Sequence, residues 1–177
     1  MNRNRWYALT GLICLLGLAA LAWGRGPGDR TAAALPPAPA MGHPAPEFTL
    51  STPEGETVTL SDLRGRPVVL NFWATWCGPC RAEMPELQRL HENLEPAGVV
   101  VLGVNQNETE TAIASFRQEL GVDFPTVIDR RMGVSREYAV NSIPTTFFID
   151  RDGTVRDIFT GPMTDAVLAD KLKAIYP

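Results

Sequence analysis

The sequence predicts an α/β domain in which helices cover both faces of a mixed β-sheet, and three observations lead to this prediction. Two apolar, β-branched runs, residues 68–73 and 99–104, are each followed by a segment with helical spacing of apolar side chains, which is typical of strand–helix–strand units. A turn signature at residues 150–153 separates two more short apolar runs, as in a hairpin. A helical segment at residues 164–175 completes the domain.

The elements at the start of the domain are short. Residues 48–50 and 57–60 are expected to form two strands around a turn at 53–55, where Pro, Glu and Gly follow one another. The loop 65–67 then leads into residues 68–73, whose apolar and aromatic side chains predict a buried central strand.

The first long helix is expected at residues 79–94, because apolar side chains recur there at three- and four-residue steps. Pro85 is expected to kink this helix. A second buried strand is expected at 99–104. The later elements are a helix at 110–120 that ends at Gly121, a short strand at 127–128, a short helix at 134–140, hairpin strands at 145–149 and 155–159, and a helix capped by Thr164 that runs to about Ile175.

The N-terminal residues have a composition of their own. Residues 6–23 contain no charged side chain, and as a helix they would span about 27 Å, close to the thickness of a bilayer core. Arg3 and Arg5 precede this run, so the N-terminus is expected on the cytoplasmic side.

We therefore expect three parts. Residues 1–24 form an N-terminal signal-anchor, a transmembrane segment; residues 25–40, rich in Pro, Gly and Ala, form a linker; and residues 41–177 form the folded domain. The protein is then a single-pass protein of the cell membrane with its domain on the extracytoplasmic (periplasmic) side. The alternative is export after cleavage of a signal peptide near residues 20–22.

Two cysteines, Cys77 and Cys80, lie at the junction between the central strand and the first helix. At this spacing they can close a reversible disulfide. Unpaired N–H groups and the helix dipole favour a thiolate at the helix N-terminus, so Cys77 is the expected nucleophile. Cys80, about one turn further into the helix, is expected to be more buried and to act as the resolving thiol. Pro79 suits the first helical turn.

Other uses of a cysteine pair are disfavoured. A zinc site needs four ligands, and His43 and His91 are isolated and expected at the surface, so no metal is expected. Haem attachment needs a histidine at position 81, which is Arg81, and a structural disulfide across two residues would stabilise little. No cofactor is expected. The net charge of −4 and the absence of a basic run disfavour nucleic-acid binding.

Residues 72–80 (FWATWCGPC) resemble the thioredoxin active site. The chain from about residue 40 to 177 resembles the membrane-anchored, extracytoplasmic TlpA/ResA-like thiol–disulfide oxidoreductases of the thioredoxin superfamily. The resemblance implies a thioredoxin fold with an N-terminal β-hairpin extension and a central strand and helix insertion. The further matching segments are residues 45–50, 60–65, 121–125 and 143–150, and the insertion covers residues 105–127.

The resemblance also implies roles near the cysteines. The family has an acidic residue at the position of Glu83 that assists proton transfer, whereas the residues alone favour an exposed carboxylate in the first helical turn. Asn71 is a departure, because thioredoxin has a buried, proton-relaying aspartate there and Asn71 cannot ionise. Trp73 is expected in the core. Arg81 is expected to be an exposed helical residue, or else to help to hold the Cys77 thiolate.

Partner contacts are expected at two loops. The resemblance implies a cis peptide bond before Pro144, which packs beside the disulfide, and a backbone at Ile143 that hydrogen-bonds an extended partner chain. Trp76, Gly78 and Pro79 are expected to contact the same partner.

We expect the chain to be a protein-disulfide oxidoreductase, with the reductase direction favoured. Its partners would be a protein disulfide substrate, which in related proteins is often apocytochrome c, and a membrane-embedded thiol donor that restores the Cys77 and Cys80 thiols. The alternatives are a disulfide-forming oxidase, a non-catalytic binding module, and a peroxiredoxin-like peroxidase. Peroxiredoxins share the 45–50 motif but place a threonine three residues before the reactive cysteine, where this chain has Ala74.

Overall fold

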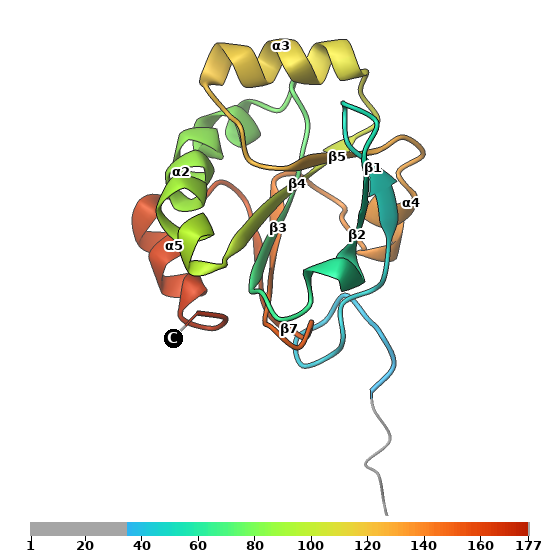
Figure 1. The fold of residues 1–177 in the computed structure, drawn as a ribbon, viewed down its shortest axis with the longest axis vertical. Coiled ribbons are helices and arrows are strands. Elements are labelled where there is room, and N and C mark those ends of the chain that lie inside the picture. Colours follow the sequence, from blue (N-terminus) through green and yellow to red (C-terminus); the bar gives the residue numbers. More distant parts are fainter. Residues whose placement is uncertain (1–34, 177) are drawn as a thin grey trace, which may run out of the picture. The chain divides into compact units, whose positions relative to one another are not determined.

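The computed structural model describes residues 35–176, and these form the expected α/β domain (Figure 1). Seven strands form one mixed sheet in the order β2-β1-β5-β4-β3-β6-β7. β3, β4 and β5 are parallel neighbours, and the other adjacent pairs are antiparallel. The strands are β1 (Thr49–Ser51), β2 (Thr57–Thr59), β3 (Val68–Trp73), β4 (Val100–Gln106), β5 (Thr126–Asp129), β6 (Thr145–Ile149) and β7 (Val155–Thr160).

Helices pack on both faces of this sheet. Alternating side chains of β3 divide the core, because successive residues of a strand point to opposite faces. Val69 and Trp73 join a cluster with α2, α3 and α5, whereas Leu70 and Phe72 join a cluster with α4 and the N-terminal hairpin. The helices are α2 (Gly78–Leu94), α3 (Glu110–Leu120), α4 (Gly133–Glu137) and α5 (Asp165–Leu172), with 3₁₀ turns η1 (Leu60–Leu63) and η2 (Glu95–Ala97).

Three expected boundaries are wrong by two residues or more. β4 continues past 104 to Gln106, because it keeps pairing with β5 there. The helix expected at 134–140 stops at Glu137, and Ala139 adopts a left-handed conformation with φ of 50°. The last helix ends at Leu172 rather than Ile175, since the next N–H groups bond three residues back, in tightened turns.

The Cys77–Cys80 motif lies at the junction between the end of β3 and the start of α2. All six residues of β3 are buried, as expected for a central strand. Among residues 35–176, no helix is both long enough and apolar enough to cross a membrane. The expected segment 1–24 lies outside the described residues.

Candidate active site

Cys77 and Cys80 are joined by a disulfide at the start of α2. Cys77 is the N-cap residue, and its Sγ accepts a hydrogen bond of 3.1 Å from the backbone N–H of Cys80. Pro79 lies in the first turn, as expected. A sulfur that accepts an N–H at a helix N-terminus is favoured as a thiolate once the disulfide is reduced, because the free N–H groups and the helix dipole both stabilise negative charge.

The two cysteines differ in what covers them. Cys80 is fully buried, whereas Cys77 keeps 5% of its surface and lies between exposed neighbours on both sides. Trp76 is the most exposed of the large apolar side chains among residues 35–176, at 71%. The exposed surface next to Cys77 is therefore formed by Trp76, Gly78 and Pro79.

A second loop faces the disulfide from the start of β6. The peptide bond between Ile143 and Pro144 is cis. The carbonyl oxygen of Ile143 lies 3.6 Å from Cys77 Sγ, so it can accept a hydrogen bond from that thiol in the reduced protein. The structure thus brings Ile143 and Pro144 next to the cysteines, although they follow Cys77 by more than sixty residues.

Glu83 is buried, so the interpretation as an exposed first-turn carboxylate is wrong. Its Oε1 accepts a 2.8 Å hydrogen bond from Asn71 Nδ2, and its Oε2 accepts a 3.1 Å bond from the backbone N–H of Met163. Burial raises the pKa of Glu83 to about 7, and the two hydrogen bonds oppose that rise by stabilising the charged form. This pKa suits a group that exchanges protons near neutral pH.

Asn71 holds this carboxylate from β3. Its side-chain amide donates both to Glu83 and to Thr146 Oγ1, at 2.9 Å, while its oxygen is buried without a partner among residues 35–176. Asn71 therefore orients Glu83, which lies on the same face of α2 as Cys80, three residues away. The ionisable member of this buried pair is therefore Glu83 on α2, since Asn71 on β3 cannot ionise.

Arg81 and Trp73 both contact α3. Trp73 is fully buried and its ring lies 4.8 Å from that of Phe116. The Arg81 guanidinium lies 4.9 Å from the same Phe116 ring and forms an ion pair with Glu119. The Arg81 side chain keeps 35% of its surface exposed, and its polar contact is with α3. Nothing in this geometry supports the idea that Arg81 stabilises the Cys77 thiolate.

The sequence reasoning missed Glu108. Its carboxylate accepts hydrogen bonds from the backbone N–H of Thr75, at 2.7 Å, and from the Thr75 hydroxyl. One signal could have found it: parallel neighbouring strands end at the same edge of a sheet, and Trp73 pairs with Asn105 at the ends of β3 and β4. Residues just beyond those two positions therefore meet.

The histidines lie apart from each other and from the cysteines in residues 35–176. Within the described part of the chain, no three His, Cys, Asp or Glu side chains gather to hold an ion. His91 is half-buried rather than at the surface, with its Nε2 3.9 Å from an Asp123 carboxylate oxygen. His43 is also half-buried, and its Nδ1 lies 3.0 Å from the Pro36 carbonyl.

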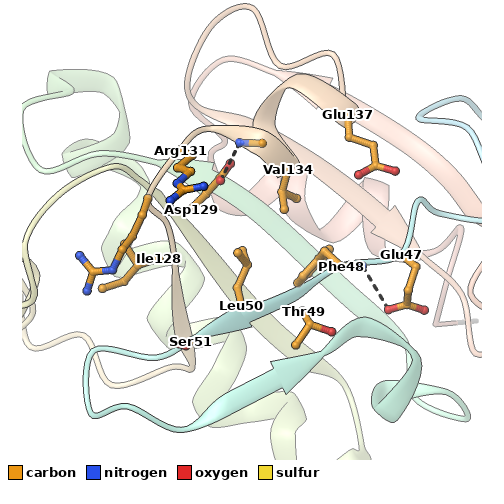
Figure 2. A pocket seen from close by; sticks show the side chains of 12 residues that line it. Glu47, Phe48, Thr49, Leu50, Ser51, Ile128, Asp129, Arg131, Val134 and Glu137 are labelled. Carbon is orange, nitrogen blue, oxygen red and sulfur yellow. Dashed lines mark hydrogen bonds between the residues drawn. The ribbon is translucent and has the colours of Figure 1, made fainter.

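A cavity of about 550 Å³ lies away from the cysteines, between β1, β5 and α4 (Figure 2). Phe48, Leu50 and Val134 line it; Phe48 and Val134 belong to the core cluster on the face opposite to Cys77 and Cys80, and Leu50 packs against that cluster. Neither Cys77 nor Cys80 lines this cavity.

Known proteins resemble this chain over most of its length. The model of the AhpC/TSA family matches residues 41–158. The thiol–disulfide oxidoreductase ResA of Geobacillus thermodenitrificans is 44% identical over 138 residues, which are 78% of this chain and 79% of that protein. ResA of Bacillus subtilis is 39% identical over 136 residues, 77% of this chain and 76% of the relative.

A solved structure shows the same fold. The crystal structure of a Chlorobium tepidum protein, assigned as a thiol:disulfide interchange protein DsbE, superposes with a TM-score of 0.71 at 32% identity. The match covers 76% of this chain and 96% of that one. These relatives and this fold are those of proteins that exchange thiols and disulfides.

Proposed function

Because the chain belongs to the AhpC/TSA family and to the ResA-like thiol–disulfide oxidoreductases, we propose that it reduces disulfides of partner proteins with Cys77 and Cys80. The observation that carries this proposal is the position of the pair. Cys77 caps a helix and keeps 5% of its surface exposed, whereas Cys80 is fully buried and precedes by three residues a buried carboxyl with a pKa of about 7.

The first step forms a mixed disulfide. The Cys77 thiolate attacks one sulfur of the partner disulfide, a new S–S bond forms, and the other partner sulfur leaves as a thiolate that takes up a proton. The helix N-terminus stabilises the attacking charge. The Ile143 backbone, next to Pro144, offers hydrogen bonds to an extended partner chain.

The second step releases the partner. Glu83 accepts the proton of Cys80, whose thiolate attacks Cys77 Sγ. The Cys77–Cys80 disulfide forms, and the partner leaves with both of its sulfurs reduced. Two electrons have then passed from this protein to the partner. Asn71 keeps Glu83 in place for the proton transfer.

The reductase direction is favoured by the Gly78-Pro79 dipeptide, which resembles that of the reducing thioredoxin. Outside the cytosol there is no reducing pool, so a membrane-embedded thiol donor would restore the dithiol. The substrate class that we propose is the Cys-X-X-Cys-His segment of an apocytochrome c, in cytochrome c maturation. The domain would work on the extracytoplasmic side of the membrane, held by residues 1–24.

A peroxidase is less well supported. The family model that matches is that of AhpC/TSA, but the buried residue three positions before Cys77 is Ala74, where peroxiredoxins have a threonine. The two ResA relatives carry the name of thiol–disulfide oxidoreductases.

Insulin reduction and partner trapping test the proposal. Cys77→Ser is expected to abolish insulin reduction, because it removes the attacking thiol and the remaining thiol of the pair, Cys80, is fully buried. Cys80→Ala is expected to accumulate a mixed disulfide through Cys77, which mass spectrometry can assign to an apocytochrome. The chain has a third cysteine, Cys14, in the expected membrane segment. Cys14→Ser is the matched control and is expected to keep full activity. Full activity of Cys77→Ser would refute the proposal.

A further inference from the structure

The insertion between β4 and β5 is attached to the chain on both sides of the Cys77–Cys80 motif. We infer that Glu108 is a positioning residue of the redox pair: from the start of this insertion it fixes the loop in front of Cys77 and so favours closure of the disulfide. The inference rests on the proposed function, because it takes Cys77 and Cys80 as the cycling pair.

The contact of Glu108 with the loop uses both oxygens of its carboxylate. Oε2 accepts the backbone N–H of Thr75 at 2.7 Å, and Oε1 accepts the Thr75 hydroxyl. A charged acceptor makes such bonds stronger than neutral ones. Thr75 precedes Cys77 by two residues, in the short segment between the end of β3 and the N-cap of α2. Fixing Thr75 therefore fixes the path of the chain into Cys77.

Glu108 is itself held in place. Asn105, the β4 residue that pairs with Trp73, donates from Nδ2 to Glu108 Oε2 at 2.7 Å. The side-chain oxygen of Asn105 accepts the backbone N–H of Glu108 at 3.2 Å. The carboxylate thus has three donors and a fixed backbone, which is more than a solvated surface glutamate would have.

The same insertion holds the other flank of the motif. Arg81 follows Cys80 directly, pairs with Glu119 and lies over the Phe116 ring, both on α3. This second attachment is partly exposed and therefore weak. Together the two contacts place the Cys77–Cys80 segment between two points that both belong to the insertion.

The consequence concerns the balance between dithiol and disulfide. When the loop is free to move, the distance between the two thiols varies more widely. The effective concentration of one thiol near the other is then lower. Loss of the Glu108 contact increases the conformational freedom of the loop more in the dithiol form than in the disulfide form, because the disulfide already restrains the same residues. The equilibrium should shift toward the dithiol.

The test measures the equilibrium constant for thiol–disulfide exchange between the purified full chain and glutathione. Protein dithiol and oxidised glutathione give protein disulfide and two reduced glutathiones, and alkylation quantifies each form. Glu108→Gln is expected to lower the equilibrium constant for disulfide formation about five- to tenfold, up to about 30 mV for this two-electron couple. Thr75→Val, which keeps the N–H donor and loses the hydroxyl, is expected to give a smaller fall in the same direction.

Glu110→Gln is the matched control. Glu110 lies in the first turn of α3 and pairs with Arg130 instead, so the equilibrium constant should stay at the wild-type value. Adding Thr75→Val to Glu108→Gln should change little further, because both act through one contact. The melting temperature of each form is measured alongside.

The outcomes distinguish the positioning role from the proposed function. A wild-type protein that does not exchange with glutathione would overturn the proposed function itself. A wild-type protein that cycles, with Glu108→Gln and Thr75→Val both at the wild-type equilibrium constant, would overturn the positioning role. Lower melting temperatures of these variants would not rescue that role, since a purely structural contact destabilises dithiol and disulfide forms alike.

Discussion

Glu83 lies in a site where burial and hydrogen bonding favour opposite charge states. The side chain is 1% exposed, which favours the neutral acid, while its two neighbours, Asn71 Nδ2 and the Met163 N–H, are both donors, which favours the carboxylate. The resulting pKa of about 7 leaves Glu83 able both to take and to return a proton at neutral pH.

The release of the partner should therefore depend on pH through Glu83. Only the carboxylate can accept the Cys80 proton, so the rate of the second step should rise as pH increases through about 7 and then level off. Glu83→Gln is expected to slow this step about 10²-fold at pH 7 and to remove the inflection. Single-turnover release from a preformed mixed disulfide measures it. An unchanged pH profile in Glu83→Gln would exclude this role.

The same residue predicts a pH dependence of stability. The pKa of Glu83 is higher in the folded protein than the unfolded value of 4.5, so the folded state holds a proton that the unfolded state has lost between these values. Glu83 contributes fully to the free energy of unfolding below about pH 4.5. This contribution falls by up to about 3 kcal/mol as pH rises to about 7, and it stays constant at higher pH. Urea unfolding at pH 5 and pH 8 should show this loss in the wild type and less of it in Glu83→Gln.

At the scale of elements, β3 and β4 approach closely behind the active site. A Cβ at Gly103 of β4 would lie 2.7 Å from Trp73 Nε1 and 3.1 Å from the Phe124 ring. Trp73 is the last residue of β3 and also packs on Phe116 of α3. The absence of a side chain at 103 therefore lets the indole fill the space below the loop that carries Cys77.

Gly103→Ala tests this packing. The added methyl group overlaps the indole nitrogen, so we expect a loss of about 1–3 kcal/mol of unfolding free energy. Gly133→Ala is the matched control, because a Cβ there meets nothing within 4 Å, and it should leave stability nearly unchanged. Equal stability of both variants in urea titrations would show that the indole has room to move.

Patterns along the chain predicted the elements around the site but not its polar contacts. β3 and α2 were predictable because an apolar, β-branched and aromatic run is followed by helical spacing of apolar side chains and a proline in the first turn. The burial of Glu83 was not, because it depends on Asn71 and on Met163, eighty positions away. Glu108 was missed because its partner, Thr75, becomes a neighbour only when β3 and β4 pair.

The predicted ends of elements were wrong where strand pairing between distant segments or a local turn sets the end. β4 extends to Gln106 because β5 continues to pair with it, and pairing between distant segments leaves no local signal. α4 ends early because Ala139 adopts a left-handed backbone conformation. Glycine and asparagine are common in that conformation, so an alanine in the sequence gives no sign of it.

At the scale of the whole molecule, the domain is expected to work at a membrane surface. We propose that residues 1–24 remain as an anchor, so the full chain should stay in the membrane pellet during alkaline carbonate extraction. A chain that begins at residue 35 and carries a cleavable export signal is the control and should be released. Full recovery of the unaltered protein in the soluble fraction, shortened at its N-terminus, would favour the cleaved signal peptide instead.

The central claim is that Cys77 and Cys80 cycle between dithiol and disulfide, and alkylation followed by mass spectrometry of the purified full chain tests it most directly. After treatment with a strong thiol reductant, the peptide that contains both cysteines should carry two alkyl groups. After oxidation it should carry none. Cys14, which is not part of the pair, serves as the reference for complete alkylation in the reduced sample. The same number of alkyl groups on that peptide under both conditions would contradict the account.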